Sequence, residues 1–386
     1  MGKETPISFQ TSHRAHFGDA GKMTTIADNS VNLVVTSPPY PMIAMWDEMF
    51  GRADPEIKKA LKQGDGPLAF ERMHGVLVRV WRKLWRVVKP GGFACINIGD
   101  AVRTVNGDFR LYPNHARILA DLLALGFSAL PAILWRKQTN APNKFMGSGM
   151  LPAGAYVTLE HEYVLIVRKG SKREFKTEAE KLHRHESAIF WEERNQWFSD
   201  IWMDLKGARQ ALGGKEARKR SAAFPFELAC RLINMYSVKG DTVLDPFLGT
   251  GTTMAAAMAT GRNSLGIEID PSLAPAIEEL TGPMVTLSNR RIAERLDHHR
   301  RFIRERMESG KPIKHTNRHY GFPVITRQET GLILNPLVEI KKKGNRTVEV
   351  VYADGSGPIE TEWGQKAGAE TPKPAGATSG QLMLNL

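Results

Sequence analysis

The sequence has only two cysteines among its 386 residues, Cys95 and Cys230, and both lie in apolar stretches. Two cysteines rule out a disulfide framework and a cysteine-cluster metal site, so each thiol is expected to pack as a small hydrophobic side chain. No apolar run reaches the length of about 18 residues that a membrane span needs, and the first residues lack the apolar core of a signal peptide. We therefore expect a soluble, cytoplasmic protein with no membrane partner.

Acidic residues are also in deficit. There are 53 Lys and Arg residues against 41 Asp and Glu, which gives a formal net charge of +12. Cationic side chains neutralise phosphates and release counterions, so this balance favours a polyanionic partner such as nucleic acid. A solvated basic surface would give the same count, so the partner has to be identified from motifs.

The most informative stretch is Thr36-Ser37-Pro38-Pro39-Tyr40, which follows the valine-rich run 31–35. Such a run predicts a buried strand, and two consecutive prolines predict a rigid loop after it. Because proline fixes φ and has no N–H, the nearby carbonyl groups are held in set directions. A polar oxygen, fixed acceptors and an aromatic ring form a receptor for a flat heterocycle that bears an exocyclic amine. Taken alone, the stretch fits equally well a proline turn with a packed tyrosine.

A second stretch, VLDPFLGTGTT at 243–253, predicts a strand, a glycine-bearing turn and the start of an alanine-rich helix. The next predicted strand, 264–269, carries Glu268. Glycines let the backbone approach a ligand closely, and an acidic residue about 20 positions further on typically binds ribose hydroxyls. The stretch lacks the Gly-Lys-Ser/Thr of a P-loop, so a nucleoside-triphosphate site is disfavoured.

Together the two stretches resemble the motifs of amino-group DNA methyltransferases. The first resembles their catalytic S/N/D-P-P-Y/F/W motif, which implies Ser37, Pro38, Pro39 and Tyr40 as catalytic residues. The second resembles their S-adenosylmethionine loop. Over roughly residues 16–270 the catalytic motif precedes the cofactor loop, as in the permuted β group, and TSPPY is most like the cytosine-N4 members. The resemblance implies S-adenosylmethionine as the cofactor, bound by Asp19, Asp245, Pro246, Phe247, Gly249, Thr250, Gly251, Thr252 and Glu268.

Alternating β and α segments predict an α/β fold. The resemblance implies a Rossmann-like methyltransferase fold: a mostly parallel seven-stranded sheet with helices on both faces, plus small recognition and C-terminal segments. Residues 1–168 are expected to form the base-binding and catalytic half, and 221–285 the cofactor-binding half. A short helix is expected before Asp28 and a mobile loop over 41–70. The remaining segments are a basic helix with a small β unit at 286–363 and a disordered tail at 364–386.

Residues 169–220 lie between the two halves, where this family holds its target-recognition region. Charged and aromatic side chains alternate there, as suits phosphate and base contacts. The expected DNA contacts of this segment are Lys172, Arg173, Lys176, Arg184 and Arg194, and the arginine-rich helix predicted over 289–307 adds Arg301 and Arg304. A solvated charged face is the alternative for both groups. His183 and His185 match no ligand set, so no metal is expected.

The expected activity is site-specific methyl transfer from S-adenosylmethionine to the N4 amine of cytosine in duplex DNA, after base flipping. Ser37 is expected to accept amine hydrogens while Tyr40 stacks on the base. Adenine N6 is the alternative target, and no Pro-Cys pair supports C5 chemistry. An inactive methyltransferase-fold DNA-binding protein is the alternative from another class. The resemblance implies a bacterial or phage enzyme near the nucleoid, in a restriction-modification system or an orphan, with a cognate endonuclease and a homodimer both open.

Overall fold

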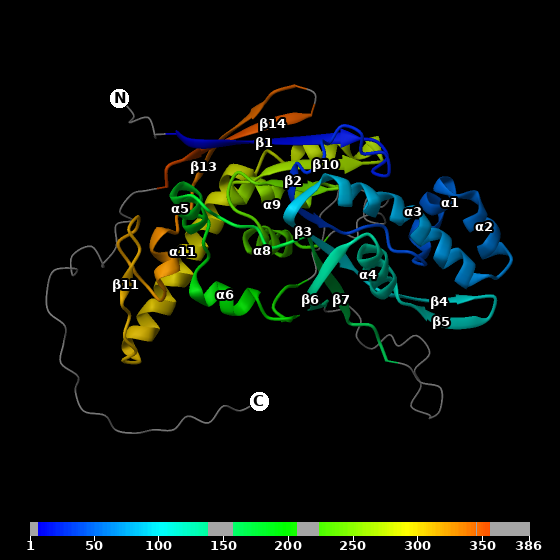
Figure 1. Ribbon diagram of the computed structural model, residues 1–386, viewed down its shortest axis with the longest axis horizontal. Coiled ribbons are helices and arrows are strands. Elements are labelled where there is room, and N and C mark those ends of the chain that lie inside the picture. The colour runs from blue at the N-terminus through cyan, green and yellow to red at the C-terminus, as the bar shows by residue number, and fades with distance from the viewer. Residues whose placement is uncertain (1–6, 138–156, 207–223, 345, 356–386) are drawn as a thin grey trace, which may run out of the picture.

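The computed structural model describes residues 7–137, 157–206, 224–344 and 346–355. Its centre is a ten-stranded sheet in the order β13-β14-β1-β10-β9-β2-β3-β7-β6-β8 (Figure 1). The strands are β1 Ile7–Phe17, β2 Val31–Thr36, β3 Val88–Ile98, β6 Phe127–Arg136, β7 His161–Lys169, β8 Ile201–Trp202, β9 Thr242–Asp245, β10 Asn263–Glu268, β13 Leu337–Lys342 and β14 Thr347–Ala353. Neighbours from β1 through β3 are parallel, as are β6 and β8, whereas the pairs β3–β7, β7–β6, β1–β14 and β14–β13 are antiparallel.

Helices cover both faces of this sheet. α3 Gly66–Val87 and α4 Asn114–Ala124 share a core with Val34, while α8 Phe226–Tyr236 and α9 Thr252–Thr260 share another core with Leu33 and Val35. Successive side chains of a strand point to opposite faces, so the continuous apolar run of β2 fills both cores. Cys95 and Cys230 are fully buried in the second core, as expected. The predicted α/β fold with helices on both faces of the sheet is confirmed.

The C-terminal β unit is not separate, and here the expected seven-stranded sheet is wrong. β14 pairs antiparallel with β1, placing Val350 opposite Thr11, and β13 pairs with β14. An uncovered β1 would leave a row of unpaired backbone groups at the sheet edge, and β14 satisfies them. The hydroxyl of Tyr352 also donates to the carbonyl of Met258 in α9 at 2.6 Å, which fixes the added hairpin to the cofactor half.

Residues 41–70 form helices, not the expected loop, and the stretch before Asp28 forms turns, not a short helix. α1 Asp47–Ala53 and α2 Pro55–Lys62 precede α3. Asp54 accepts a hydrogen bond from the backbone N–H of Glu56, and Asp65 accepts one from that of Leu68. A proline is the first residue of α2 and the second residue of α3. These are strong helix-start signals, which the sequence interpretation overlooked.

A second packed unit, which we call the far lobe, comprises 170–198 and 284–334. It lies at the end of the sheet where the parallel strands begin, on the left of Figure 1. Its helices are α5 Glu178–Glu186, α6 Trp191–Trp197 and α11 Met284–Glu308. The smaller elements of the chain are η1 Ala44–Trp46, β4 Ala101–Val105, β5 Asp108–Tyr112, η2 Pro271–Leu273, α10 Ala274–Glu279, β11 His315–Thr316, β12 Pro323–Val324 and η3 Arg327–Gly331.

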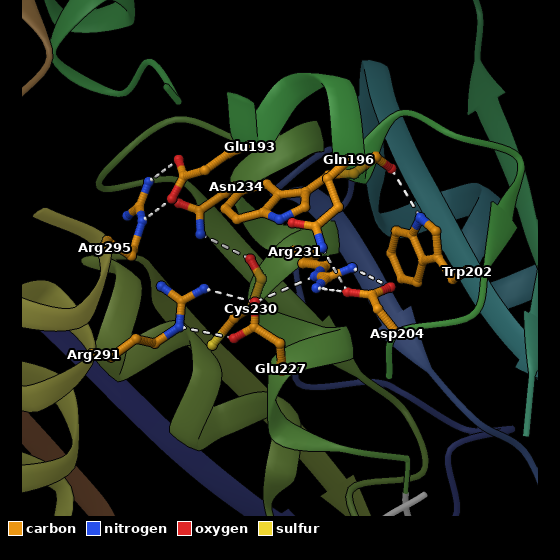
Figure 2. Close-up of polar contacts among 11 residues, drawn as sticks. Glu193, Gln196, Trp202, Asp204, Glu227, Cys230, Arg231, Asn234, Arg291 and Arg295 are labelled. Carbon is orange, nitrogen blue, oxygen red and sulfur yellow. Dashed lines mark hydrogen bonds and ion pairs between the residues drawn. The ribbon is translucent and has the colours of Figure 1, made fainter. Parts of the chain in front are cut away.

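Arginines of α11 join two helices within the far lobe and join the lobe to α8 on the sheet (Figure 2). Arg295 of α11 forms a double hydrogen bond with Glu193 of α6, at 2.6 and 2.7 Å, and Arg291 pairs with Glu227 of α8 at 3.1 Å. Both arginine side chains are nearly buried. Part of the arginine content of α11 is therefore internal and does not face a partner.

Part of one predicted segment and the whole of another lie outside the described residues. These are residues 207–220 of the expected recognition segment and the expected tail 364–386. Among the described helices, none is long and apolar enough to cross a membrane.

Candidate active site

The two sequence motifs meet at one edge of the sheet. Ser37 follows the carboxyl end of β2, and Asp245 ends β9, the neighbouring parallel strand. β10, ending in Glu268, and β1, followed by Asp19, continue the same row. In open α/β sheets, ligands bind outside the carboxyl ends of the strands. The structure thus brings the expected catalytic residues and the expected cofactor residues side by side.

Asp245 connects the two motifs. Its carboxylate accepts a hydrogen bond from Thr36 Oγ1 at 2.6 Å and another from Thr253 Oγ1 at 2.7 Å. It also accepts the backbone N–H of Phe247 at 3.0 Å. The side chain is buried, and burial raises the pKa of the Asp245 carboxyl to about 6 against the lowering effect of these hydrogen bonds. Both carboxylate oxygens bind protein groups in this structure. The expected contact of Asp245 with the cofactor stays a prediction.

The glycine-bearing turn has the backbone that its sequence demands. Gly249 and Gly251 have φ values of 56° and 91°, in the left-handed region that glycine adopts at little cost. Glu268 Oε2 accepts the backbone N–H of Gly249 at 2.7 Å, and Oε1 accepts that of Asp270 at 2.8 Å. Burial raises the pKa of the Glu268 carboxyl above its usual value. Glu268 therefore fixes the glycine-bearing turn through its hydrogen bond to Gly249.

The other expected cofactor residues surround this turn. Pro246 is buried, Thr250 and Thr252 are half-buried, and Phe247 packs edge-on against Trp81 with ring centroids 6.1 Å apart. Asp19 is exposed after β1, where its carboxylate accepts the backbone N–H of Gly21 at 2.8 Å.

The expected catalytic loop, Ser37 to Tyr40, is closely packed. Ser37 is half-buried, whereas Pro38, Pro39 and Tyr40 are buried. Ser37 Oγ donates a hydrogen bond to the Tyr40 hydroxyl at 3.2 Å. Tyr40 packs so closely on Gly99 that an added Cβ would stand 3.0 Å from the ring. The side chain of Tyr40 is only 8% exposed. Its stacking on a base stays a prediction.

Three residues that were not among the expected site residues, Asn97, Lys137 and Glu162, complete this loop. The Tyr40 hydroxyl donates to Glu162 Oε2 at 2.9 Å. Asn97 Nδ2 donates to the Tyr40 oxygen at 3.0 Å and to Glu162 Oε2 at 2.6 Å, and Lys137 Nζ donates to Glu162 Oε1 at 2.8 Å. Burial and the nearby Glu162 charge raise the pKa of Tyr40 well above its usual value. In the sequence, one signal for Glu162 was a charged residue at the start of an otherwise apolar strand.

The expected DNA contacts lie elsewhere. Arg173 pairs with Asp241, just before β9, at 2.7 Å, which places it at the opposite edge of the sheet from Ser37. A cleft of about 880 Å³ opens there, and four of the expected contacts line it: Lys172, Arg173, Arg184 and Arg194. Lys176 is exposed before α5, and Arg301 and Arg304 are exposed on α11. The structure brings none of these seven residues to the catalytic loop.

Comparisons with known proteins agree with this geometry. Residues 31–279 match a family model described as DNA methylase, of the N6/N4 type. The chain is 51% identical over 346 residues to the Type II methyltransferase M.MthZI of Methanothermobacter thermautotrophicus, covering 89% of this chain and 96% of that protein. It is 51% identical over 287 residues to the Type II methyltransferase M.MjaI of Methanocaldococcus jannaschii, covering 72% and 93%.

A solved structure gives the same result. TTHA0409 of Thermus thermophilus, described as a DNA modification methylase and solved with S-adenosyl-L-methionine, is 34% identical, with a TM-score of 0.55. The match covers 70% of this chain and 94% of that one. The matched residues include both motifs and the strands that carry them, and this chain therefore belongs to the N6/N4 family of S-adenosylmethionine-dependent DNA methyltransferases.

Proposed function

We propose that the protein transfers the methyl group to the N4 amine of cytosine at a specific site in duplex DNA. The observation that carries this proposal is the hydrogen bond from Ser37 Oγ to the Tyr40 hydroxyl. A hydroxyl has one proton to donate and two lone pairs that accept. Because the proton of Ser37 is directed to Tyr40, the lone pairs of Oγ are left to accept hydrogens from a substrate amine.

The amine needs such an acceptor because its lone pair is delocalised into the ring. Accepting its hydrogens shifts the nitrogen towards a tetrahedral form whose lone pair faces the cofactor's methyl group. The sulfonium of the cofactor is already a strong electrophile, so positioning and electrostatics supply most of the rate. Because β2 and β9 are neighbours, the loop proposed to bind the amine would lie beside the expected cofactor loop. Flipping the base costs a few kcal/mol, which contacts in the pocket offset.

The order of the motifs supports the permuted β group. The strand that carries Ser37 comes before the strand that ends in Asp245, although the two are paired neighbours in the sheet. The TSPPY form of the loop supports cytosine over adenine. The names of M.MthZI and M.MjaI support a type II restriction-modification role, with a cognate endonuclease as a partner. Assembly into a homodimer is also compatible with this role.

The far lobe is the proposed site of additional DNA contacts. Its cleft combines the cationic residues Lys172, Arg173, Arg184 and Arg194 with aromatic residues such as Phe175 and Phe198. The guanidinium groups of Arg173 and Arg184 each lie 4.8 Å from the Phe175 ring centre, which presents both charges at one place. Because this cleft opens opposite the catalytic edge, its contacts would tether DNA away from the target base and contribute mainly phosphate binding.

The product identifies the target atom. Duplex DNA methylated by the purified protein is digested to nucleosides, and the modified nucleoside is assigned by mass and retention time. We expect N4-methylcytosine; N6-methyladenine alone would assign the protein to the adenine enzymes, and no labelled product would favour a binding protein without activity.

Ser37→Ala tests the acceptor role. It should cut turnover by about 100-fold or more while cofactor affinity changes little, because Ser37 acts on the amine. Ser12→Ala, on the exposed face of β1, is the matched control and should leave the rate unchanged. Full activity of Ser37→Ala would refute the role of this hydroxyl even with the expected product.

A further inference from the structure

We infer that Glu162 is a positioning residue for methyl transfer, which polarises Ser37 through Tyr40 and takes up the proton that the methylated amine releases. The inference rests on the proposed role of Ser37. It adds a residue 122 positions away from Tyr40 in the chain, contributed by a different strand.

The geometry is a directed chain of hydrogen bonds. Ser37 Oγ donates to the Tyr40 hydroxyl at 3.2 Å, and this hydroxyl donates to Glu162 Oε2 at 2.9 Å. Every donor in the chain points away from the place where the substrate amine would lie. A carboxylate at the end of such a chain strengthens each bond before it, because aligned hydrogen bonds polarise one another in a low dielectric. Ser37 thereby becomes a better acceptor than an isolated hydroxyl.

The surroundings preserve this arrangement. Glu162 is 8% exposed, Tyr40 is 8% exposed and Asn97 is 2% exposed, so little water competes for these bonds. Asn97 Nδ2 donates to both other groups, at 3.0 Å to Tyr40 and at 2.6 Å to Glu162. A neutral donor at this point aligns the tyrosine with the carboxylate without adding charge. Lys137, which donates to Glu162 Oε1 at 2.8 Å, compensates the buried negative charge.

The chain also provides a path for the proton. As the N–CH3 bond forms, the S–CH3 bond breaks and its electron pair stays on sulfur, leaving a neutral thioether and a positively charged amine. That amine then loses one proton to Ser37 Oγ, while Ser37 passes its own proton to Tyr40 and Tyr40 passes its own to Glu162. The step ends with neutral amine, intact hydroxyls and a protonated Glu162, which returns the proton to solvent on the side of half-buried Lys137.

Among the described residues, the titratable or charged groups in contact with Glu162 are Tyr40, from the loop after β2, and Lys137, from the end of β6. Neither is positioned to replace a carboxylate as proton acceptor, because the phenol is the donor in this chain and Lys137 carries a positive charge. The relay therefore requires the negative charge of Glu162.

The test is single-turnover methyl transfer from labelled cofactor to duplex DNA. Tyr40→Phe and Glu162→Gln should each lower the rate by about 10-fold to 1000-fold, with cofactor affinity within about twofold of wild type. The double variant should be no slower than the slower single variant, because both changes interrupt one chain. Glu160→Gln is the matched control, since Glu160 is a surface partner of Arg136 and its replacement should leave the rate unchanged.

Glu162→Asp distinguishes chemistry from packing, since it keeps the charge and should recover part of the rate that Glu162→Gln loses. If Glu162→Gln and Glu162→Asp are equally slow, Glu162 only supports the fold and the inference is wrong. Full rates for Tyr40→Phe or Glu162→Gln with an inactive Ser37→Ala would refute the relay and leave the proposed function intact. A fully active Ser37→Ala would instead refute the acceptor role proposed for Ser37, on which the relay rests.

Discussion

Replacing Asp245 by asparagine should stabilise the cofactor-free protein at alkaline pH, although it removes a charged residue of the cofactor motif. Asp245 is 3% exposed, and within the described part of the chain none of its hydrogen-bond partners carries a positive charge. Burial raises the pKa of this carboxyl to about 6. The charged form is therefore less stable inside the protein than in the unfolded chain.

The sign and size follow from proton binding. In the unfolded chain an aspartate has a pKa of about 3.9, so the folded state holds the Asp245 proton more tightly. Stability is then lost as pH rises from about 4 to about 6, by about 1.4 kcal/mol per pH unit and about 3 kcal/mol in total. Asparagine avoids this loss. Its oxygen can still accept from Thr36, and its NH2 would face Thr253, whose hydroxyl can turn to the Val35 carbonyl at 3.2 Å.

The rearranged hydrogen bonds cost roughly 1 kcal/mol, which leaves a net gain of about 1 to 3 kcal/mol above pH 7. Urea unfolding followed by tryptophan fluorescence at pH 5 and pH 8 measures this difference. The gain should be large at pH 8 and shrink at pH 5. Asp297→Asn, at an exposed position on α11, is the control and should show no such pH dependence. An Asp245→Asn protein that is less stable than wild type at both pH values would refute the reasoning.

Two further predictions concern ligands. Glu268→Ala should weaken cofactor binding by about 1.5–3 kcal/mol in calorimetry while DNA binding persists, because it removes both the proposed ribose acceptor and the anchor of the Gly249 turn; unchanged affinity would remove the assignment. Neutralising Arg301 together with Arg304 should flatten the salt dependence of DNA binding by roughly one unit of slope per lost phosphate contact. A slope identical to wild type would show that these arginines do not contact DNA.

The two motifs were predictable from sequence because each is local. A buried strand, a proline loop and a glycine turn are specified by residues within about a dozen positions of one another, and parallel strands bring their carboxyl ends to one edge. The pairing of β2 with β9 then follows from the fold class. The roles of single side chains within those motifs were less predictable. Asp245 belongs to the cofactor motif, yet its carboxylate binds Thr36 and Thr253.

Glu162 escaped prediction for a related reason. Its partners Tyr40 and Asn97 lie on other strands or their loops, 122 and 65 positions away, so no spacing along the chain relates them. Only the register of the sheet does: Ile98 lies opposite Tyr163, which brings the ends of β3 and β7 together. A charged residue that interrupts an apolar strand is the sequence signal for such a partner, and it identifies the residue without identifying what it meets.

The placement of the expected recognition segment depends on the direction of a single strand. The sequence predicts strands and their order well, but it specifies poorly whether a given strand runs parallel or antiparallel to its neighbour. β7 runs antiparallel to β3, so the chain that leaves it at Lys169 emerges at the edge opposite Ser37. Had β7 been parallel, Lys172 and Arg173 would follow it at the catalytic edge. The same basic residues thus change from candidate contacts beside the target base to candidate contacts with distant phosphates, and one reversed strand is the physical cause.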